Sequence, residues 1–281
     1  MPHPRIKLYW LNKSRAQRIV WLLQELHLNY DVESFRRGPD MRAPRELLQV
    51  HPLGKSPVVR ISLPGLEDAA TSSNSSGPRD LVLAESGFIA QYLVEHFGQG
   101  VTGAPRRLAP RRYRDGCEGQ PGGETEAWLR YQYFLHYAEG SLMPPLLVGL
   151  ILEVLKSPRI PFLIRPITSR VSNQLAAAFV APELARNLAF LEEQLKTAPG
   201  GDGSGKGYLC GPHLTAADIL MVFPLQVARQ RAGGLTHGKE GKQLAEQFSV
   251  VWEYLERLES EPGCKRAEEQ TRNWEDHEPE G

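Results

Sequence analysis

The chain has 281 residues and a mass of 31.5 kDa, with 33 basic and 33 acidic side chains and a formal net charge of zero. A chain of this length can bury one large core or two smaller ones. Without a basic excess there is no long-range field to attract nucleic acid, so no nucleic-acid partner is expected. The three cysteines, Cys117, Cys210 and Cys264, are too scattered to predict a metal site or a disulfide framework.

The first hundred residues alternate strand and helix patterns. A buried strand is predicted over residues 5–11, and apolar positions at helical spacing follow from Ser14. The elements predicted after these are, in order, a strand at 30–35, a short helix at 43–50, strands at 58–61 and 81–83, and a helix at 85–97. This order predicts an α/β domain over residues 1–98, a small mixed sheet of four strands with helices on its faces.

The rest of the chain is helical in pattern. Residues 99–125 are rich in Gly, Pro and Arg and predict a linker, an all-helical bundle is predicted over 126–262, and the polar residues 263–281 predict a flexible tail. The most apolar stretch, 142–155, is shorter than the ~20 residues that span a bilayer, and predicts a core helix or the floor of a binding groove. Association with a membrane surface stays open.

A loop motif enters the third strand. It reads His51-Pro52-Leu53-Gly54-Lys55-Ser56-Pro57-Val58-Val59. A proline favours an extended backbone in the residue before it, and an X-Pro bond in a tight turn is where a cis peptide costs only ~0.5–1 kcal/mol relative to trans. A cis Ser56–Pro57 bond would turn the Ser56 N–H and C=O outward, where they could pair with an extended peptide ligand.

A second motif, Leu83-Ala84-Glu85-Ser86, places a carboxylate and a hydroxyl where a strand becomes a helix. Free N–H groups at a helix start favour an anion. The two motifs together predict a clamp for a small peptide that carries a free amino-acid moiety. A third pattern, Thr215-Ala216-Ala217-Asp218, predicts a capping box that serves folding.

These motifs resemble the glutathione-binding half of the glutathione S-transferases, whose patterns run Asn/His-Pro-x-Gly-Lys-x-Pro and then Glu-Ser. The runs that extend the resemblance are Leu8–Leu11, Ser14–Arg18, Trp21–Leu23 and Gly207–Leu220. Further runs, at residues 42–44, 83–89 and 139–142, are similar to the fungal, yeast-type branch. The resemblance spans residues 5–262 and implies a thioredoxin-like first domain, an all-α second domain and a homodimer.

The resemblance also implies how a thiol would be activated. In serine-type members a hydroxyl at the position of Ser14 donates a hydrogen bond to the glutathione sulfur. From the residues alone, Ser14-x-x-Gln17 is equally a capping box without a catalytic task. The amide of Asn12 is the alternative donor, whereas strand alternation predicts that Tyr9 packs in the core.

The remaining predicted site residues fall into two groups. Glu85 and Ser86 would hold the γ-glutamyl end of glutathione, while the loop motif would meet its backbone and glycine carboxylate through His51, Lys55, Ser56 and Pro57. The wall of an electrophile pocket is predicted from three residues of the second domain, Tyr133, Tyr137 and Met143. The alternative for these three is an ordinary aromatic core at helical spacing.

The function that this resemblance implies is conjugation of the glutathione thiolate to a hydrophobic electrophile, with glutathione as co-substrate, no metal and a role in detoxification. Reduction of organic hydroperoxides would use the same site. The alternatives are a glutathione-dependent isomerase and a non-catalytic glutathione-binding or scaffold protein. The sequence begins Met1-Pro2-His3-Pro4 with no apolar leader region, so a cytoplasmic location is expected.

Overall fold

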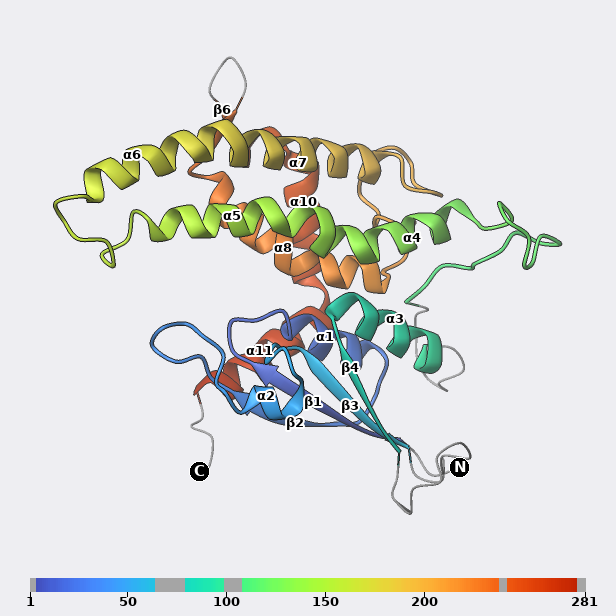
Figure 1. Ribbon diagram of the computed structural model, residues 1–281. Helices are drawn as coiled ribbons and strands as arrows, with labels where there is room; N and C mark the ends of the chain where they lie inside the picture. Colours follow the sequence, from blue (N-terminus) through green and yellow to red (C-terminus); the bar gives the residue numbers. More distant parts are fainter. Residues whose placement is uncertain (1–3, 64–78, 99–107, 238–241, 277–281) are drawn as a thin grey trace. The chain divides into compact units, whose positions relative to one another are not determined.

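The computed structural model describes residues 4–63, 79–98, 108–237 and 242–276. Contacts divide the chain into two compact units, residues 1–106 with 261–281, and residues 107–260. The first unit contains a four-stranded mixed sheet with helices on its faces, and the second is helical apart from a two-stranded ribbon of β5 (Thr236–His237) and β6 (Lys242–Gln243) (Figure 1). The predicted fold class is confirmed.

The sheet of the first unit brings four chain segments to one end. It consists of β1 (Arg5–Leu11), β2 (Tyr30–Phe35), β3 (Val58–Leu63) and β4 (Arg79–Ala84), in the order β2-β1-β3-β4. The β1 and β2 strands are parallel, and β3 is antiparallel to both β1 and β4. Tyr9 and Ala84 both lie opposite Val58 in the register. The carboxyl ends of β1, β2 and β4 therefore lie beside the amino end of β3.

Helices cover this sheet because their apolar positions lie on one face. The α1 helix (Gln17–Glu25) connects the parallel strands β1 and β2 and buries Ile19, Val20, Leu22 and Leu23. The short α2 (Leu47–Val50) buries Leu47 against Tyr9 and Val58, so Tyr9 is a core residue as predicted. The α3 helix (Ser86–Phe97) begins directly after β4.

The chain after the helical unit returns to the first unit. Residues Pro262–Asp276 form α11, which packs against α1, so the prediction of a flexible tail is wrong for these residues (Figure 1). The Trp274 ring meets Trp10 edge-on at 5.5 Å, and Gln270 accepts a hydrogen bond from Gln24 at 2.6 Å. At Gly263 the helices approach so closely that a Cβ would lie 2.5 Å from Nε1 of Trp21.

Two long helices of the helical unit continue through a π turn that is followed by proline. The first joins α4 (Glu126–Tyr137), the π-helical turn η1 (Ala138–Leu142) and α5 (Met143–Val154), and the second joins α6 (Arg165–Leu175), η2 (Ala176–Val180) and α7 (Ala181–Lys196). Each π turn lies directly before the proline-containing start of the next helix. A proline removes one N–H and clashes with the preceding turn, and the wider π turn accommodates it.

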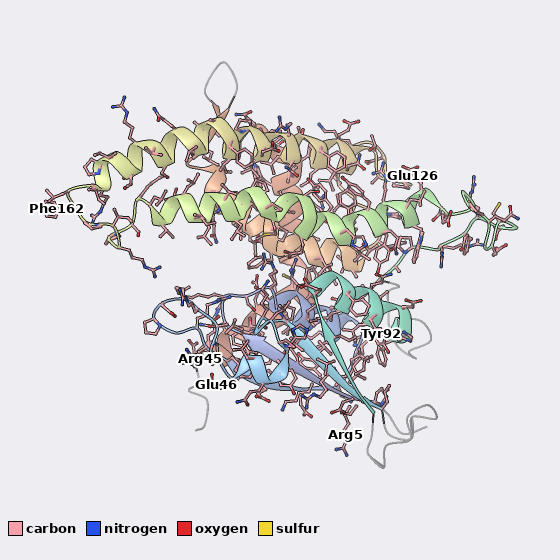
Figure 2. All side chains as sticks on the ribbon, in the orientation of Figure 1. Arg5, Arg45, Glu46, Tyr92, Glu126 and Phe162 are labelled. Atoms are coloured by element: carbon pink, nitrogen blue, oxygen red, sulfur yellow. The ribbon has the colours of Figure 1, made fainter. Side chains whose placement is uncertain are left out.

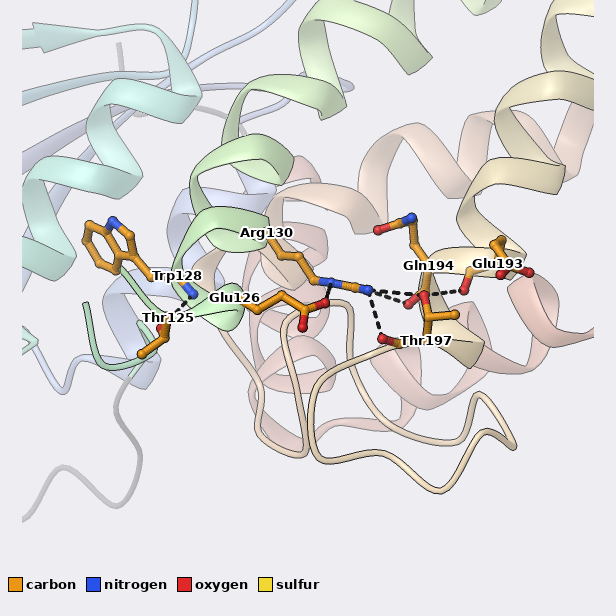
Figure 3. Close-up of polar contacts among 7 residues, drawn as sticks. All are labelled: Thr125, Glu126, Trp128, Arg130, Glu193, Gln194 and Thr197. Carbon is orange, nitrogen blue, oxygen red and sulfur yellow. Dashed lines mark hydrogen bonds and ion pairs between the residues drawn. The ribbon is translucent and has the colours of Figure 1, made fainter. Parts of the chain in front are cut away.

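The predicted linker belongs largely to the helical unit. Leu108 is buried and its carbonyl accepts a hydrogen bond from Ala216 N–H at 2.8 Å, while residues 99–107 lie outside the described part. Thr125 caps α4 by accepting from the Trp128 N–H at 3.1 Å (Figure 3). Arg130 then donates to the carbonyls of Gln194 and Thr197 at 2.9 and 2.8 Å, placing a cation at the carboxyl end of α7 (Figure 3).

The predicted capping box forms at the start of α8 (Ala216–Ala232). Asp218 is fully buried and accepts four hydrogen bonds, from Leu209 N–H, Thr215 N–H, the Thr215 hydroxyl and the Tyr254 hydroxyl, at 2.6 to 3.0 Å. Tyr254 belongs to α10 (Ser249–Ser260), which follows the short α9 (Leu244–Gln247). Burial raises the pKa of Asp218, and the hydrogen bonds from Tyr254 and Thr215 oppose that shift. The box thus ties three segments of the bundle together.

Candidate active site

The loop between β1 and α1 contains Ser14, whose hydroxyl donates no hydrogen bond to another described residue. The Ser14 Oγ accepts a hydrogen bond from the Ala16 N–H at 3.2 Å, and α1 begins after Ala16 without a side-chain cap. The capping box with Gln17 that the sequence allowed is therefore not formed. Within the described residues no group accepts the Ser14 hydroxyl proton. A half-buried hydroxyl in this state can donate to a ligand.

Asn12 is held in the same loop by the segment that follows β2. Its Oδ1 accepts from the Arg37 N–H at 2.8 Å, and its carbonyl accepts from Arg37 Nε at 3.3 Å. Because the amide oxygen faces an N–H donor, the amide NH₂ is the other end of the side chain, and within the described residues it has no hydrogen-bond partner. Asn12 therefore combines an anchoring oxygen with a donor that could face a thiolate.

Arg37 is a residue that sequence reasoning missed. Besides contacting Asn12, it donates from Nη1 to the Met41 carbonyl at 3.0 Å. Burial lowers its pKa, and the nearby positive charge of Arg15 lowers it further. Two cations beside the β1–α1 loop favour an anion at the loop. The adjacent Arg36-Arg37 pair after β2 is the sequence signal that could have indicated it.

The His51–Pro57 segment forms the turn that the motif predicts. The Ser56–Pro57 peptide bond is cis, as expected. The His51 carbonyl accepts from the Gly54 N–H at 2.8 Å, and Gly54 has the left-handed φ of 56° that favours glycine. The Ser56 hydroxyl donates to the Tyr9 carbonyl at 2.9 Å, which anchors the turn to β1.

Two side chains of this turn, His51 and Lys55, differ in the hydrogen bonds that they form. The His51 Nδ1 accepts from the Leu53 N–H at 3.3 Å, so its other ring nitrogen carries the proton when the ring is neutral. Lys55 is exposed, and its side chain forms no hydrogen bond or ion pair with any other described residue. The Ser56 N–H and C=O likewise have no backbone partner in the described part of the chain. These groups are the ones an extended peptide ligand could use.

At the junction of β4 and α3, the two residues of the Glu-Ser motif have different environments. Glu85 precedes α3 with φ 71° and ψ 119°, an unfavourable backbone conformation for a residue with a side chain. Its exposed carboxylate has no partner among the described residues. Ser86 is only 5% exposed, and its Oγ accepts from Arg18 Nη2 at 3.1 Å. Glu85 is thus available to a ligand, whereas Ser86 also joins α3 to the buried Arg18.

These loops meet because of the strand order. Asn12 and Ser14 follow β1, Arg37 follows β2, Ser56 precedes β3 and Glu85 follows β4. All five therefore lie at the same end of the sheet of the first unit. This end combines hydroxyl and amide donors, cations, free backbone groups and one free carboxylate, which suits a short zwitterionic peptide with a thiol.

The residues predicted for an electrophile pocket lie in the second unit and differ in accessibility. Tyr137 is buried, stacks on Tyr133 with ring centroids 5.6 Å apart, and donates from its hydroxyl to Asn187 at 2.6 Å. Burial raises the pKa of Tyr137. Met143 is also buried, and Tyr133 alone of the three is exposed, by 50%. For Tyr137 and Met143 this burial favours the alternative of an aromatic core, and the pocket itself stays a prediction.

The second unit also contains a cavity of about 640 Å³ between α5, η2 and the end of α8. Its lining includes the charged residues Glu153, Lys156 and Arg231. Burial lowers the pKa of Arg231, while Glu153 raises it. A lining of this polarity suits an apolar electrophile poorly. No group of three or more His, Cys, Asp or Glu residues that could hold a metal ion occurs within the described residues.

Comparisons with known proteins match both halves of the chain in order. A family model described as the glutathione S-transferase N-terminal domain matches residues 14–96, and one described as the C-terminal domain matches residues 173–257. These matches define the class as a two-domain glutathione transferase. Glutathione S-transferase 1 of Saccharomyces cerevisiae is 31% identical over 272 residues, covering 97% of either chain. The chain therefore belongs to the glutathione S-transferase family, a family of transferase enzymes.

Other relatives agree with this assignment. Glutathione S-transferase 3 of Schizosaccharomyces pombe is 28% identical over 226 residues, covering 80% of this chain and 75% of its own. A glutathione S-transferase structure from Actinobacillus pleuropneumoniae is 25% identical, with a TM-score of 0.58 and coverage of 95% and 93%. A transferase from Phanerochaete chrysosporium, solved with oxidized glutathione, is 16% identical with a TM-score of 0.62 and coverage of 99% and 100%, and supports the fold alone.

Proposed function

We propose that the chain transfers the thiolate of glutathione to a hydrophobic electrophile. The observation that carries this proposal is the Ser14 hydroxyl, whose proton has no acceptor within the described residues although the oxygen is fixed by the Ala16 N–H. A thiol in reach of this hydroxyl would receive a hydrogen bond that stabilises its ionised form. Members of the family shown with bound glutathione have the same fold.

Glutathione would bind extended along the loop end of the sheet. The Ser56 N–H and C=O would pair with its cysteinyl backbone, and the Glu85 carboxylate would accept from its free ammonium group. The γ-glutamyl carboxylate would lie at the start of α3, where N–H groups and the helix dipole favour an anion. Lys55 and His51 would meet the glycine carboxylate. Each charged end of the peptide thus finds an opposite charge or a donor.

Activation means lowering the thiol pKa. A free cysteine thiol has a pKa near 8.5, and lowering it by about 2 units stabilises the thiolate by ~2.7 kcal/mol. A hydroxyl donor, the positive charges of Arg15 and Arg37, and the N–H groups at the start of α1 supply this order of energy. The Asn12 amide is the alternative donor. Holding the thiolate against the electrophile would provide the remaining acceleration.

Two other outcomes use the same site. With an organic hydroperoxide as the substrate, two glutathione molecules would give the disulfide while the peroxide is reduced to an alcohol and water. A glutathione-binding scaffold without turnover would keep the clamp but leave the bound thiol protonated at neutral pH. Thiolate absorbance of bound glutathione against pH separates a transferase from a scaffold, because only a transferase lowers the apparent pKa. A panel of electrophiles and hydroperoxides then identifies the reaction.

The clamp itself is tested with Glu85→Gln, which keeps the shape and removes the charge. Hydrogen bonds to charged groups contribute about 1.5–3 kcal/mol, so glutathione affinity measured by calorimetry should fall roughly 10- to 100-fold. The matched control is Glu95→Gln, an exposed carboxylate on the same helix. Equal affinities for both variants and the parent would show that Glu85 does not hold the ligand.

A further inference from the structure

We propose that the carboxyl end of α11 positions the loop that would activate the thiol, and that Arg36 is the residue through which it acts. This inference rests on the proposed function, and it concerns residues outside those assigned above to glutathione. Arg36 follows β2 directly. Its Nη2 group donates to the carbonyls of Trp274 and Glu275 at 3.4 and 2.8 Å. The segment after β2 is thereby bonded to the last turn of α11.

Arg36 supplies what the end of α11 lacks in its own sequence. The last four carbonyls of a helix have no partner inside the helix, and a cation beside them offsets the negative end of the helix dipole. The last turn of α11 contains no basic residue, and it ends in two acidic ones, Glu275 and Asp276. The contact with Arg36 therefore stabilises both the end of the helix and the position of the arginine.

Segment 35–37 is bonded on its other side to Asn12. The Asn12 N–H donates to the Phe35 carbonyl at 3.2 Å. In return, the Arg37 N–H donates to Asn12 Oδ1 at 2.8 Å and Arg37 Nε donates to the Asn12 carbonyl at 3.3 Å. These three hydrogen bonds fix both the backbone and the amide of Asn12, and Ser14 follows in the same loop. The segment thus connects α11 to both candidate thiol donors.

A ring contact holds the end of α11 at the same place. The first turn of α11 lies against Trp21 of α1, where Gly263 permits the close approach, and the helix then runs along the sheet of the first unit (Figure 1). At its other end Trp274 meets the buried Trp10 edge-on, with ring centroids 5.5 Å apart. Trp10 lies on β1 just before the Asn12 loop and opposite Ser34 in the register. The end of α11 is therefore fixed beside the carboxyl ends of β1 and β2.

The position of the loop matters because a hydrogen bond depends steeply on geometry. It weakens when its distance grows or its angle departs from linear. Without the contact from α11, segment 35–37 and Asn12 would be held less firmly, and the bond to the thiolate would be weaker on average. The pKa of the bound thiol should then rise and turnover should slow, while Ser56 and Glu85 still hold the peptide.

The charge of Arg36 offers a second explanation for the same effects, since a cation near the site also favours a thiolate. The two explanations predict opposite signs for a chain that ends at Asn273. This truncation removes both carbonyl acceptors and the Trp274 ring, so loss of positioning raises the thiol pKa. It also removes four acidic residues and no lysine or arginine, and charge alone would therefore lower that pKa. The four are Glu275, Asp276, Glu278 and Glu280.

Absorbance titration of bound glutathione against pH tests the proposal on three changes, Arg36→Met, Trp274→Ala and the truncation after Asn273. Each should raise the apparent thiol pKa by about 0.5–1 unit, roughly half of the shift expected when a donor is lost outright. Turnover should fall about tenfold with the KM for glutathione little changed, because misplacing a reacting group by ~1 Å can cost up to ~100-fold. Trp274→Ala leaves every charge in place, so it tests positioning even if the truncated chain does not fold.

Two controls separate positioning from general support of the fold. Gln270 of α11 accepts from Gln24 at 2.6 Å and from the Tyr30 hydroxyl at 3.1 Å, and Tyr30 begins β2 at the end away from the site. Gln270→Ala should therefore lower the stability to urea without moving the thiol pKa. The second control is Arg45→Met, at an exposed arginine labelled in Figure 2 just before α2. Its side chain has no hydrogen bond or ion pair in the described part of the chain, so neither quantity should change.

The outcomes distinguish this inference from the proposed function. A wild-type titration near the value of the free thiol would refute the proposed function and the positioning role with it. A lowered wild-type pKa that Trp274→Ala and the truncation leave unchanged, or lower further, would refute the positioning role alone. Equal shifts for Trp274→Ala and Gln270→Ala would also overturn it, because α11 would then only stabilise the unit.

Discussion

Two helix starts in this chain carry the same short pattern but have different structures. At α8, Thr215-x-x-Asp218 closes into a buried box whose carboxylate accepts four hydrogen bonds. At α1, Ser14-x-x-Gln17 forms no cap, and Ser14 keeps its hydroxyl proton free within the described residues. The pattern thus identifies a helix start, but burial and the number of satisfied partners decide whether the hydroxyl serves the fold or is available for chemistry.

The start of α3 is intermediate between these two. Ser86 is buried, and its oxygen accepts from Arg18, but Glu85 beside it is exposed and unpaired in the described part of the chain. The three helix starts therefore predict a series of stability losses, large at Asp218, moderate at Ser86 and small at Ser14. Measuring the free energy of unfolding for one variant at each start tests that series.

The largest loss is expected for Asp218→Asn. An amide has one oxygen in place of two and points an NH₂ group at groups that are themselves donors. Leaving buried donors unpaired costs ~1–3 kcal/mol each, so unfolding in urea should show a loss of roughly 3 kcal/mol or more. The control is Glu193→Gln, an exposed carboxylate of the same unit, for which the change should stay within about 0.5 kcal/mol. A loss below about 1 kcal/mol at Asp218 would contradict a structural role for the box.

A moderate loss is expected for Ser86→Ala. The substitution removes one hydrogen-bond acceptor of Arg18 Nη2 in a buried place, which should cost about 1–2 kcal/mol in the same assay. It should also weaken glutathione binding, so Ser86 alone cannot separate a binding role from a folding role. Glu85→Gln at the same helix start is the control, because its carboxylate forms no hydrogen bond or ion pair with any other described residue. Equal stability of the two variants would show that the Ser86 hydroxyl, like that of Ser14, contributes little to the stability of the fold.

Much of this could be predicted from the sequence where local patterns decide the structure. The strand and helix order of the first unit, the turn at Ser56–Pro57 and the Glu85 junction follow from alternation, proline and helix-start signals. The segments of the two long helices were predicted as separate helices, and their continuity through the π turns was not predicted, because a π turn is a tertiary adjustment that propensity does not predict. Arg37 was missed because its role depends on Asn12, which is 25 residues away in the sequence.

The sequence contains a weak signal for the α11 helix. Its polar composition suggested a tail, yet Cys264, Ala267, Thr271 and Trp274 recur at intervals of three and four residues, the spacing of one helix face. The first three are buried, and Trp274 contacts Trp10 from the far end of the sequence. Such a narrow stripe predicts a helix only when the partner surface is known, and α1 supplies that surface through a long-range contact.

The smallest loss of stability, and the largest change in chemistry, is expected for Ser14→Ala. The Ala16 N–H loses an acceptor in a half-buried place, so unfolding should change by no more than about 1 kcal/mol. If the hydroxyl donates to the sulfur, the apparent pKa of bound glutathione should rise by about 1–2 units and turnover should fall, with glutathione affinity changing much less. Absorbance titration of the bound thiol, together with urea unfolding, gives both quantities.

Three companion variants give this result a single interpretation. Ser14→Thr keeps a hydroxyl and should keep the thiol pKa, while Gln17→Ala should change nothing if no capping box exists at α1. Asn12→Asp keeps the oxygen that accepts from the Arg37 N–H but removes the amide donor and adds a negative charge, so a titration unchanged by it would remove Asn12 from the sulfur site. If Ser14→Ala leaves the titration unshifted and lowers the free energy of unfolding by about 2 kcal/mol, Ser14 serves as a helix cap at α1, as Thr215 does at α8. If the Asn12 variant also leaves the titration unshifted, the scaffold alternative gains, because neither of the two candidate side chains of the loop then ionises the thiol.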